Sequence, residues 1–349
     1  MKYCKLGRTG LDVSRICLGT MGFGDGSTQS WTVDEEAARG MIKKAIDGGI
    51  NFIDTANVYS YGKSEEIVGR AIRDFGVREE IVLATKFYSD MRPGRPNGGG
   101  ASRKEIFHEL DESLKRLGTD YVDLYILHRW DYSTPIEETM EALNDVVRMG
   151  KVRYIGASAM FAWQFIKARN IAEKHGWANF ISMQDHYNLL YREEEREMAP
   201  YCIDAGVALT PYKSLAAGRL ARDRKTVTKR LTEDRNATLK YYGKTEEEDG
   251  VIIDRVGEVA ERNGLSRIDV AIGWLLQKQP VASAICGVTK ESHVDGLLHA
   301  AETVLSAEDM AYLEEAYVPH EYDALKLWNS MDTEAKLLGS GKGTHQSLK

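Results

Sequence analysis

The sequence lacks the features that would suit a polyanion or a lipid bilayer. Its 46 lysine and arginine residues are outnumbered by 53 aspartate and glutamate residues, which gives a formal net charge of −7. A nucleic-acid-binding protein needs a basic surface for its phosphate contacts, and no basic block interrupts this acidic balance. No segment has the roughly 20 consecutive apolar residues of a membrane span, and the first residues lack the apolar core of a signal peptide. We therefore expect a cytoplasmic protein with neither a nucleic-acid partner nor a membrane partner.

Cysteine is scarce, and its spacing does not suit a metal or redox site. Cys4, Cys17, Cys202 and Cys286 occur singly, without the paired spacing of a zinc site or a dithiol motif. We interpret them as small apolar residues of the interior. No HExxH motif and no pair of histidines at ligand spacing occurs either, so metal-dependent hydrolysis is a weak alternative and we predict no metal.

Two common nucleotide-binding motifs are also absent. Four glycines lie between positions 19 and 26, but they do not have the spacing of the Rossmann fingerprint. Residues 62–64 end like a P-loop, but Asn57 stands where the first glycine of that motif is required. These departures argue against nucleoside triphosphate hydrolysis and against a dinucleotide bound in the Rossmann manner.

What the sequence does contain is an alternation of short apolar runs with longer amphipathic stretches. This alternation predicts repeated βα units around a parallel sheet, and continuously apolar runs are typical of strands covered on both faces. A (β/α)8 TIM barrel commonly has about 250 residues or more in one unit, so 349 residues suit a single barrel. The eight predicted strands are residues 15–18, 51–54, 81–85, 121–127, 154–157, 180–184, 207–210 and 282–286.

The predicted barrel has additions at both ends. We expect residues 1–320 to form one α/β catalytic domain, with a short N-terminal hairpin in residues 3–13 at the bottom of the barrel and extra helices in the C-terminal part. We expect residues 321–349 to be a partly mobile C-terminal extension, because no apolar periodicity continues beyond Gly339. Thr32, Ser102 and Thr134 each precede a glutamate by three positions and predict capping boxes at helix starts, the last supported by Pro135.

Ionisable residues recur where predicted strands end. Asp54 closes one strand, while Lys86 and His128 directly follow the next two, and Tyr59 lies in the loop after Asp54. A lone residue of these types is more often a helix cap, a solvated charge or a satisfied core group. Barrel active sites, however, are built at the C-terminal ends of the strands, so we expect these four side chains to converge there.

The same residues resemble the motifs of the aldo-keto reductase family. Residues 52–59, Phe-Ile-Asp-Thr-Ala-Asn-Val-Tyr, with Gly-Lys-Ser-Glu-Glu at 62–66, are similar to the signature that contains the family's catalytic Asp and Tyr. Residues 84–86 and 124–128 resemble its lysine and histidine motifs, and residues 150–158 its fifth-strand motif. The resemblance extends over about residues 3–318 and is strongest to bacterial and fungal members of the group that contains aryl-alcohol dehydrogenases.

The resemblance implies an oxidoreductase that passes hydride from a nicotinamide cofactor to an aldehyde or ketone, or in the reverse direction. Because reduction leaves negative charge on oxygen, a proton donor must stand beside the carbonyl, and Tyr59 is the implied general acid and base. A nearby ammonium favours tyrosinate, so we expect Lys86 to lower the pKa of Tyr59. Asp54 would keep Lys86 protonated, and His128 would orient the carbonyl or donate a second hydrogen bond.

The family pattern further implies a site for NADP(H), with NAD(H) as the alternative. Ser158 and Gln184 would contact the nicotinamide amide, Tyr212 would stack on its ring, and Lys290 at a helix start would receive a phosphate. The full expected set is Thr20, Met21, Asp54, Ser158, Gln184, Tyr212, Lys213, Leu215, Gly218, Gly287, Thr289, Lys290 and His293.

Three departures from the family pattern affect this expected site. Ala159 stands where many relatives have Asn, and Leu297 where Asn lies near the adenine. Residues 212–218, Tyr-Lys-Ser-Leu-Ala-Ala-Gly, replace Trp-Ser-Pro-Leu-Ala-Arg-Gly, which places the cation of Lys213 near the expected pyrophosphate.

An aromatic-lined substrate pocket is expected from Trp31, Tyr59, Tyr88, His128 and Trp130, although these side chains suit ordinary packing equally well. The physiological substrate, the direction of the reaction and the oligomeric state stay open. A second function also stays open: a regulatory subunit that senses the nicotinamide cofactor, binding it tightly and releasing it slowly.

Overall fold

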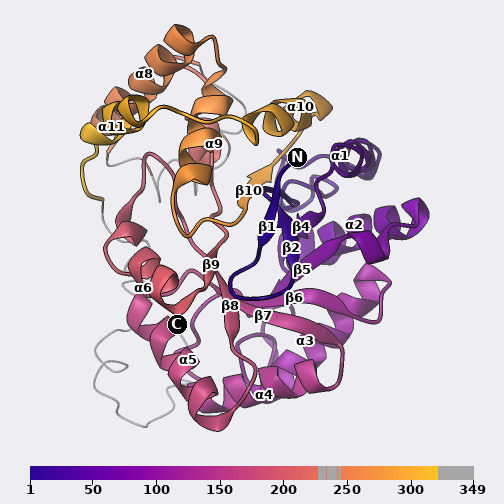
Figure 1. Ribbon diagram of the computed structural model, residues 1–349. Coiled ribbons are helices and arrows are strands. Elements are labelled where there is room, and N and C mark those ends of the chain that lie inside the picture. Colours follow the sequence, from indigo (N-terminus) through magenta and orange to yellow (C-terminus); the bar gives the residue numbers. More distant parts are fainter. Residues whose placement is uncertain (227–232, 234–241, 243–244, 321–349) are drawn as a thin grey trace.

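A closed barrel of parallel strands forms the centre of the molecule (Figure 1). The computed structural model describes residues 1–226, 233, 242 and 245–320. The barrel strands are β3 (Ile16–Gly19), β4 (Phe52–Asp54), β5 (Val82–Phe87), β6 (Val122–Leu127), β7 (Val152–Ser158), β8 (Phe180–Gln184), β9 (Ala208–Leu209) and β10 (Ala284–Gly287). They pair in parallel in the order β10-β3-β4-β5-β6-β7-β8-β9.

Backbone hydrogen bonds join the two ends of this sheet. The amide of Leu209 donates to the carbonyl of Pro280 at 3.1 Å, and the amide of Ala282 donates to the carbonyl of Leu209 at 2.9 Å. The predicted (β/α)8 TIM barrel is therefore confirmed, and each observed strand overlaps a predicted one. The largest differences, of two residues, are at the start of β7, the end of β5 and the start of β10. Strand β9 has only two residues.

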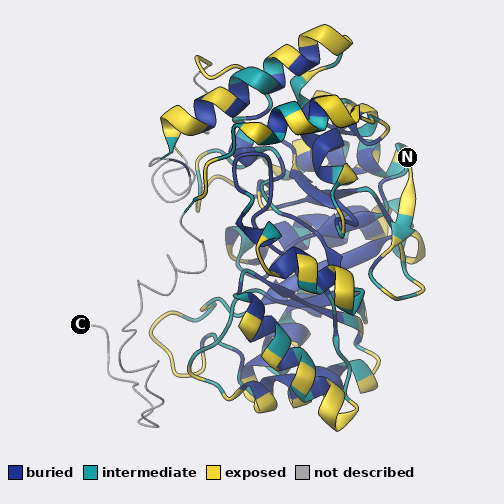
Figure 2. Ribbon diagram, turned by 60° about the vertical axis from the view of Figure 1, so that its left-hand side comes forward, coloured by how far each residue is buried: buried dark blue, intermediate teal, exposed yellow. Residues whose placement is uncertain are grey.

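Helices surround the strands and turn their exposed sides outward (Figure 2). They are α1 (Glu35–Asp47), α2 (Lys63–Phe75), α3 (Arg103–Leu117), α4 (Ile136–Arg148), α5 (Ala162–His175), α6 (Met198–Ala205), α8 (Glu246–Asn263), α9 (Arg267–Gln277), α10 (Glu291–Ala300) and α11 (Ala307–Glu315). Short 3-10 helices are η1 (Tyr59–Gly62), η2 (Arg78–Glu80), η3 (Glu193–Glu195) and η4 (Ala216–Gly218). The extra helices α8 and α11 pack against each other beside α9 (Figure 1).

The predicted N-terminal hairpin is present at the bottom of the barrel. Strands β1 (Tyr3–Lys5) and β2 (Asp12–Ser14) pair antiparallel. Its turn passes over the N-terminal ends of β8 and β9, where Gly7 has a φ of 63° and an added Cβ would lie 2.7 Å from the carbonyl oxygen of Ile181. Glycine is required there by both the left-handed backbone and the close approach. The hairpin leaves the opposite end of the barrel open for a site.

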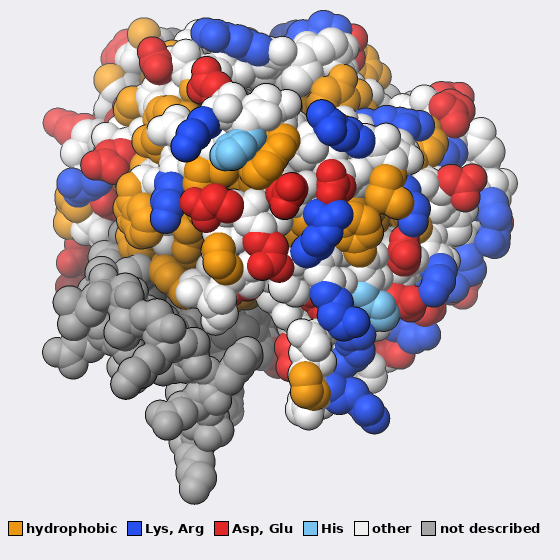
Figure 3. All heavy atoms as spheres, turned by 90° about the horizontal axis from the view of Figure 1, so that it is seen from below, with side chains coloured by type: hydrophobic (Ala, Val, Ile, Leu, Met, Phe, Trp, Pro, Cys, Tyr) orange, Lys and Arg blue, Asp and Glu red, His pale blue; other side chains and the backbone are white. Residues whose placement is uncertain are grey.

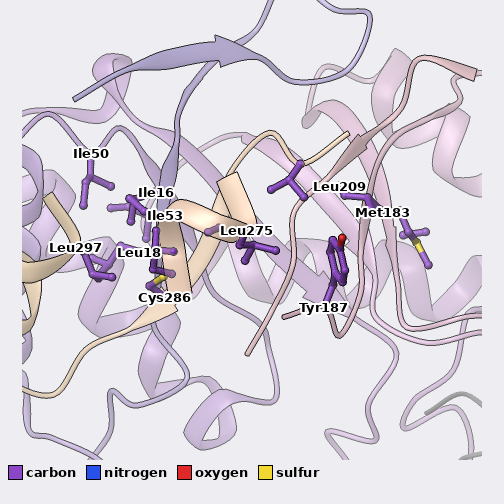
Figure 4. Close-up of a cluster of buried hydrophobic side chains, with 14 of the residues drawn as sticks. Ile16, Leu18, Ile50, Ile53, Met183, Tyr187, Leu209, Leu275, Cys286 and Leu297 are labelled. Carbon is purple, nitrogen blue, oxygen red and sulfur yellow. The ribbon is translucent and has the colours of Figure 1, made fainter. Parts of the chain in front are cut away.

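Two groups of apolar side chains fill the interior because successive strand residues point to opposite faces. Cys17 and Phe52 belong to the group inside the barrel, whereas their neighbours Leu18 and Ile53 face the helices. Figure 4 shows Leu18 and Ile53 near Leu297 of α10. Burying one large apolar side chain contributes roughly 1.5–3 kcal/mol, so this double core provides most of the stability of the barrel.

Charged side chains pair across the surface and contribute much less. Arg103 of α3 is paired with Asp145 of α4 at 2.5 Å, and Lys151 with Asp111 at 2.6 Å. Acidic and basic side chains are interspersed over the face drawn in Figure 3. Exposed pairs of this kind contribute about 0–1 kcal/mol each.

Of the three residues predicted to start capping boxes, only Ser102 caps its helix, and its box is incomplete because the Glu105 side chain pairs with Arg92 instead. Ser102 does cap α3, accepting a hydrogen bond from the amide three residues later at 3.3 Å. Helix α1 is instead capped by Asp34, because the hydroxyl of Thr32 is engaged with the backbone of its own loop. The hydroxyl of Thr134 donates to Asp131 at 2.7 Å, and α4 starts without a side-chain cap. In both cases the hydroxyl group forms a hydrogen bond within its loop and does not cap the helix.

The extension predicted for residues 321–349 lies outside the described residues. Within the described part of the chain, none of the helices has the length and apolar character needed to cross a membrane.

Candidate active site

Four predicted side chains meet at the C-terminal ends of neighbouring strands. Asp54 is the last residue of β4, Lys86 lies near the end of β5, His128 directly follows β6, and Tyr59 begins η1. The Nζ atom of Lys86 donates to Asp54 Oδ1 at 2.5 Å, to the carbonyl oxygen of Thr55 at 2.8 Å and to the Tyr59 hydroxyl at 3.2 Å. This ammonium is fully buried and uses three acceptors, so its burial is compensated by hydrogen bonds.

The second oxygen of Asp54 connects the ion pair to the far side of the barrel. It accepts a hydrogen bond from Nε2 of Gln184, the last residue of β8, at 2.9 Å. The hydroxyl of Ser158, the last residue of β7, donates to the Gln184 carbonyl at 2.8 Å. Thr20, after β3, donates to the backbone carbonyl of Asp54 from both its amide and its hydroxyl, at 2.9 and 3.0 Å. Residues expected at the cofactor thus adjoin the group of Asp54, Tyr59, Lys86 and His128, called the tetrad below.

The rings of Tyr59 and His128 face each other edge to face, with centres 6.0 Å apart and planes at 82°. Both side chains are half-buried. The Nδ1 atom of His128 is buried and has no hydrogen-bond partner among the described residues. A carbonyl oxygen that reached the Tyr59 hydroxyl would therefore have a second polar group beside it.

The protonation states of the tetrad follow from burial and neighbouring charge. Burial opposes the charge on Lys86, but attraction to Asp54 and Tyr59 outweighs it and raises the pKa of Lys86. Burial, together with the positive charges of Lys86 and Arg129, lowers the pKa of His128 well below its usual value. At neutral pH, the site combines a charged ammonium with a neutral imidazole.

The charge of Lys86 acts to lower the pKa of Tyr59, as expected, but the net pKa of Tyr59 is raised. Burial raises the pKa of Tyr59, and the charge of Lys86 offsets only part of that effect. Burial is the largest cause, and Asp54, which neutralises much of the Lys86 charge, acts in the same direction. The Tyr59 hydroxyl is therefore protonated at neutral pH, as a proton donor must be.

Two residues of the signature motif, Asn57 and Glu65, were given no role in the site, yet they hold the Tyr59 loop in place. The amide of Asn57 donates to the Lys86 carbonyl at 3.2 Å, and its side chain donates to Glu109 of α3 at 2.7 Å. Glu65 of α2 accepts from Thr85 at 2.5 Å and is paired with Arg116 at 2.5 Å. These contacts join distant segments, so the motif includes both residues but could not indicate their partners.

The segment after β9 carries several of the expected cofactor residues in an unusual backbone. Lys213, Ala216 and Ala217 have φ angles of 54°, 49° and 57°, followed by 93° at Gly218. The Lys213 ammonium lies 5.7 Å from the centre of the Tyr212 ring. Left-handed residues other than glycine are costly, so the surrounding structure must hold this segment in place. A ligand that passes it would meet fixed backbone groups.

A second group of expected cofactor residues lies at the start of α10. Gly287 ends β10, Lys290 precedes the first residue of α10, and the amide of Thr289 donates to Nδ1 of His293 at 3.3 Å. Burial lowers the pKa of His293, and the charges of Lys290 and Arg222 lower it further. This end of α10 therefore collects positive charge at a helix N-terminus, an arrangement that fits a phosphate group.

Arg222 was missed by the sequence analysis. Its guanidinium lies near Gly218, where an added Cβ would be 3.5 Å from a guanidinium nitrogen, and its charge also acts on His293. Arg222 thus lies beside the segment after β9 and close enough to the start of α10 for its charge to act on His293. A single arginine in a polar loop gives no sequence signal of such a role.

The remaining expected cofactor residues are distributed around the same end of the barrel. Thr20 is buried under Asp54, whereas Met21 is 37% exposed. Leu215 is half-buried, and its carbonyl accepts a hydrogen bond from Gly218 at 2.8 Å. Leu297 packs in the core, so it offers no polar contact to an adenine. Ala159 has a φ of 46°, a backbone conformation that Asn tolerates better than Ala.

The expected substrate residues are only partly brought together. Tyr59 contacts His128, and the Trp130 ring packs against Trp163 of α5 rather than against another predicted residue. Tyr88 has a φ of 130°, and burial, with the negative charge of Asp131, raises its pKa to about 12. Trp31 lies in the β3–α1 loop, near Gly22. Among the described residues, no cluster of His, Cys, Asp and Glu could hold a metal ion.

Comparison with known proteins agrees with this geometry. The sequence pattern of the Aldo/keto reductase family matches residues 15–318. The chain is 44% identical over 337 residues to the versiconal hemiacetal acetate reductase of Aspergillus parasiticus, and the aligned region covers 91% of this chain and 98% of the relative. It is 43% identical over 342 residues to a putative aryl-alcohol dehydrogenase of Schizosaccharomyces pombe, covering 91% and 96%. An aldo-keto reductase of Fusarium vanettenii is 40% identical over 341 residues, covering 91% of each chain. The resemblance inferred from the motifs is confirmed, and the chain belongs to the aldo/keto reductase family of oxidoreductases.

Proposed function

We propose that the protein reduces aldehyde or ketone carbonyls to alcohols, or catalyses the reverse reaction, with NADP(H) as its cofactor and Tyr59 as general acid and base. The observation that carries the proposal is the contact of one buried ammonium, that of Lys86, with both Asp54 at 2.5 Å and the Tyr59 hydroxyl at 3.2 Å. An exposed lysine would not need such partners. A buried one beside a half-buried phenol suits proton transfer.

The tetrad divides the chemical work as follows. The protonated Tyr59 hydroxyl donates its proton to the oxygen of a bound carbonyl, and the Lys86 ammonium stabilises the tyrosinate that remains. Asp54 keeps that ammonium charged and in place. His128, neutral at physiological pH, donates a hydrogen bond that orients the carbonyl. The reverse reaction uses the same groups, with tyrosinate as the base.

The residues at the ends of β7, β8 and β10 fit a nicotinamide dinucleotide. When bound, the nicotinamide supplies or accepts the hydride. Gln184 uses one amide hydrogen on Asp54 and keeps its side-chain oxygen and second hydrogen for a carboxamide, and Ser158 keeps its acceptor lone pairs. Tyr212 would stack on the ring, while Lys213 would face the pyrophosphate. Lys290, Arg222 and His293 would hold the additional phosphate that distinguishes NADP(H) from NAD(H).

The test follows oxidation of NADPH and NADH through the loss of reduced-nicotinamide absorbance, with a panel of aldehydes and ketones. Tyr59→Phe should lower kcat by about 10²–10⁴-fold while leaving cofactor affinity unchanged, because only the proton donor is lost. Tyr61→Phe is the matched control, since this tyrosine lies two residues away and is 56% exposed. Equal activity of the wild type and Tyr59→Phe would refute the assigned role.

The same measurement separates the proposed enzyme from a cofactor sensor. Turnover of carbonyl substrates at ordinary rates is expected of the enzyme. Tight binding and slow release of NADPH without turnover of any carbonyl would instead support a regulatory subunit.

A further inference from the structure

One arginine outside the barrel is connected to the strand that carries Lys86. Arg116 is the next-to-last residue of α3, and its Nε atom lies 2.5 Å from Oε2 of Glu65 on α2. The other oxygen of Glu65 accepts a hydrogen bond from the hydroxyl of Thr85 at 2.5 Å. Thr85 directly precedes Lys86 in β5. One side of the guanidinium thus acts, through a single carboxylate, on the residue beside the buried ammonium.

The same guanidinium also faces the loop that carries Tyr59. Its Nη2 atom lies 3.8 Å from Oε2 of Glu109, and that oxygen accepts a hydrogen bond from the side chain of Asn57 at 2.7 Å. Asn57 lies two residues before Tyr59, and its backbone amide donates to the Lys86 carbonyl at 3.2 Å. The two carboxylates that face Arg116 are at most 2% exposed, and buried carboxylates need a nearby positive charge. Arg116 supplies that charge to both.

The stem of the arginine packs against the end of the turn that begins at Tyr59. Gly62 ends η1, and a Cβ added to it would lie 2.6 Å from Cδ of Arg116. Within the turn, Ser60 and Tyr61 both have a φ of 49°, a left-handed conformation that is costly for residues other than glycine. Such a backbone persists only where the surrounding structure holds it. Arg116 closes against this turn from outside the barrel.

These contacts do more than join two helices. Helices α2 and α3 already pack closely elsewhere, since a Cβ added to Gly69 would clash with the backbone of Leu117. An ion pair that only joined the helices could lie anywhere along their contact. Arg116 instead lies where three of its contacts lead to residues beside Lys86 or in the Tyr59 loop.

We propose that Arg116 is a positioning residue for the proton transfer. By holding the residues beside both groups, it sets the separation between the Lys86 ammonium and the Tyr59 hydroxyl, which is 3.2 Å. The inference rests on the proposed function, because the position of Tyr59 matters only if it is the proton donor. Arg116 acts through its neighbours, so its loss should slow the chemical step and leave ligand binding unchanged.

The experiment compares Arg116→Met with the wild type on one aldehyde substrate. The kcat should fall about 10- to 100-fold, while the KM for the aldehyde and the Kd for NADPH change less than about 2-fold, because a small misplacement of a reacting group slows the reaction without weakening binding. A single turnover with the enzyme in excess should show the same fall in its rate constant. Partial unfolding would lower the amplitude of that turnover and not its rate constant.

Three further variants separate positioning from folding. Arg116→Lys keeps the positive charge but not the fork that faces two carboxylates, so it should restore part of the rate constant. Asn57→Ala removes only the hydrogen bond to Glu109, so it tests the inference even if Arg116→Met does not fold, with an expected fall in kcat of about 3- to 10-fold. Arg73→Met is the matched control, because this exposed arginine pairs with Asp74 on the surface and should change neither constant.

Hydrogen–deuterium exchange tests the same contacts without turnover. Amides of residues 57–62 should exchange faster in Arg116→Met, whereas those of β7 and β8 should match the wild type. Unchanged exchange at residues 57–62 would overturn the inference. It would equally be overturned by unaltered rate constants in Arg116→Met and Asn57→Ala when Tyr59→Phe is inactive. Full activity of Tyr59→Phe, together with faster exchange at residues 57–62 in Arg116→Met, would instead reject the proposed function and leave only the support of the loop.

Discussion

Asp54 and Lys86 form a buried ion pair whose charged atoms lie 2.5 Å apart, and both side chains are at most 2% exposed. Taking two charges out of water is costly, and the attraction between them repays this cost only when the remaining hydrogen-bonding positions are filled. Here Thr55, Tyr59 and Gln184 fill them. The stability of the fold and the proposed proton transfer therefore involve the same pair.

Replacing one partner should expose this dependence. Lys86→Met leaves Asp54 buried without a counter-charge, and we expect a loss of about 3–5 kcal/mol in the free energy of unfolding, measured by urea denaturation. The double variant Asp54→Asn, Lys86→Met removes both charges and should recover much of that loss while remaining inactive. Lys63→Met is the control, because this exposed lysine pairs with Glu66 on the surface and should cost at most about 1 kcal/mol. A double variant no more stable than Lys86→Met would contradict the account.

The raised pKa of Tyr59 predicts how its ionisation depends on pH. In the folded protein, Tyr59 should stay protonated as pH rises through its usual value near 10, because burial outweighs Lys86. The unfolded chain loses this proton at a lower pH than the folded protein does. The contribution of Tyr59 to the free energy of unfolding is therefore fully present below pH 10, and it declines as pH rises from there towards the folded pKa. The tyrosinate absorbance of the wild type minus that of Tyr59→Phe should show no ionisation below pH 10. A step well below 10 would restore the expectation drawn from the sequence.

The charges at the start of α10 predict cofactor discrimination. Arg222→Met should raise the Kd for NADPH about 10- to 100-fold, the range for losing a charge-assisted hydrogen bond, and leave the Kd for NADH unchanged. Quenching of protein fluorescence by each cofactor measures both constants without turnover. Arg224→Met is the matched control, since Arg224 is exposed and pairs with Asp254 at 3.3 Å. Equal weakening of NADPH and NADH binding would mean that Arg222 does not bind the extra phosphate of NADPH.

Sequence periodicity was sufficient for the barrel because each strand is covered on both faces, and a continuous apolar run such as residues 124–127 suits few other structures. The tetrad could be predicted for a related reason: strand ends share one rim, so residues like Asp54 and Lys86 need only a correct strand register to be brought together. The predicted helix caps were wrong where the hydroxyl forms a hydrogen bond within its loop instead, as that of Thr134 does with Asp131.

The rest of the site depends on contacts between segments far apart in the chain. The charge of Arg222 acts on His293 of α10, and the ring of Trp163 packs against Trp130 of a separate loop. The pKa of Tyr59 was misjudged for the same reason. The direction of the effect of Lys86 is evident from residue types, but its balance against burial and Asp54 requires coordinates.

The backbone at Ala159 carries a strain that one substitution should relieve. Its φ of 46° lies in the left-handed region, which costs an alanine roughly 1–2 kcal/mol and which Asn adopts more readily because its side chain can hydrogen-bond locally. The half-buried position also leaves the longer side chain a path to solvent. Ala159→Asn should therefore raise the free energy of unfolding by about 0.5–1 kcal/mol, measured by urea denaturation.

The control is Ala307→Asn, because Ala307 is an exposed helical alanine with ordinary backbone angles. There the same change should lower the free energy of unfolding by about 0.5 kcal/mol, because Asn is the poorer helix former. Opposite signs at the two positions would attribute the gain to the backbone at residue 159, whereas a loss at both would show that the left-handed conformation is not strained there.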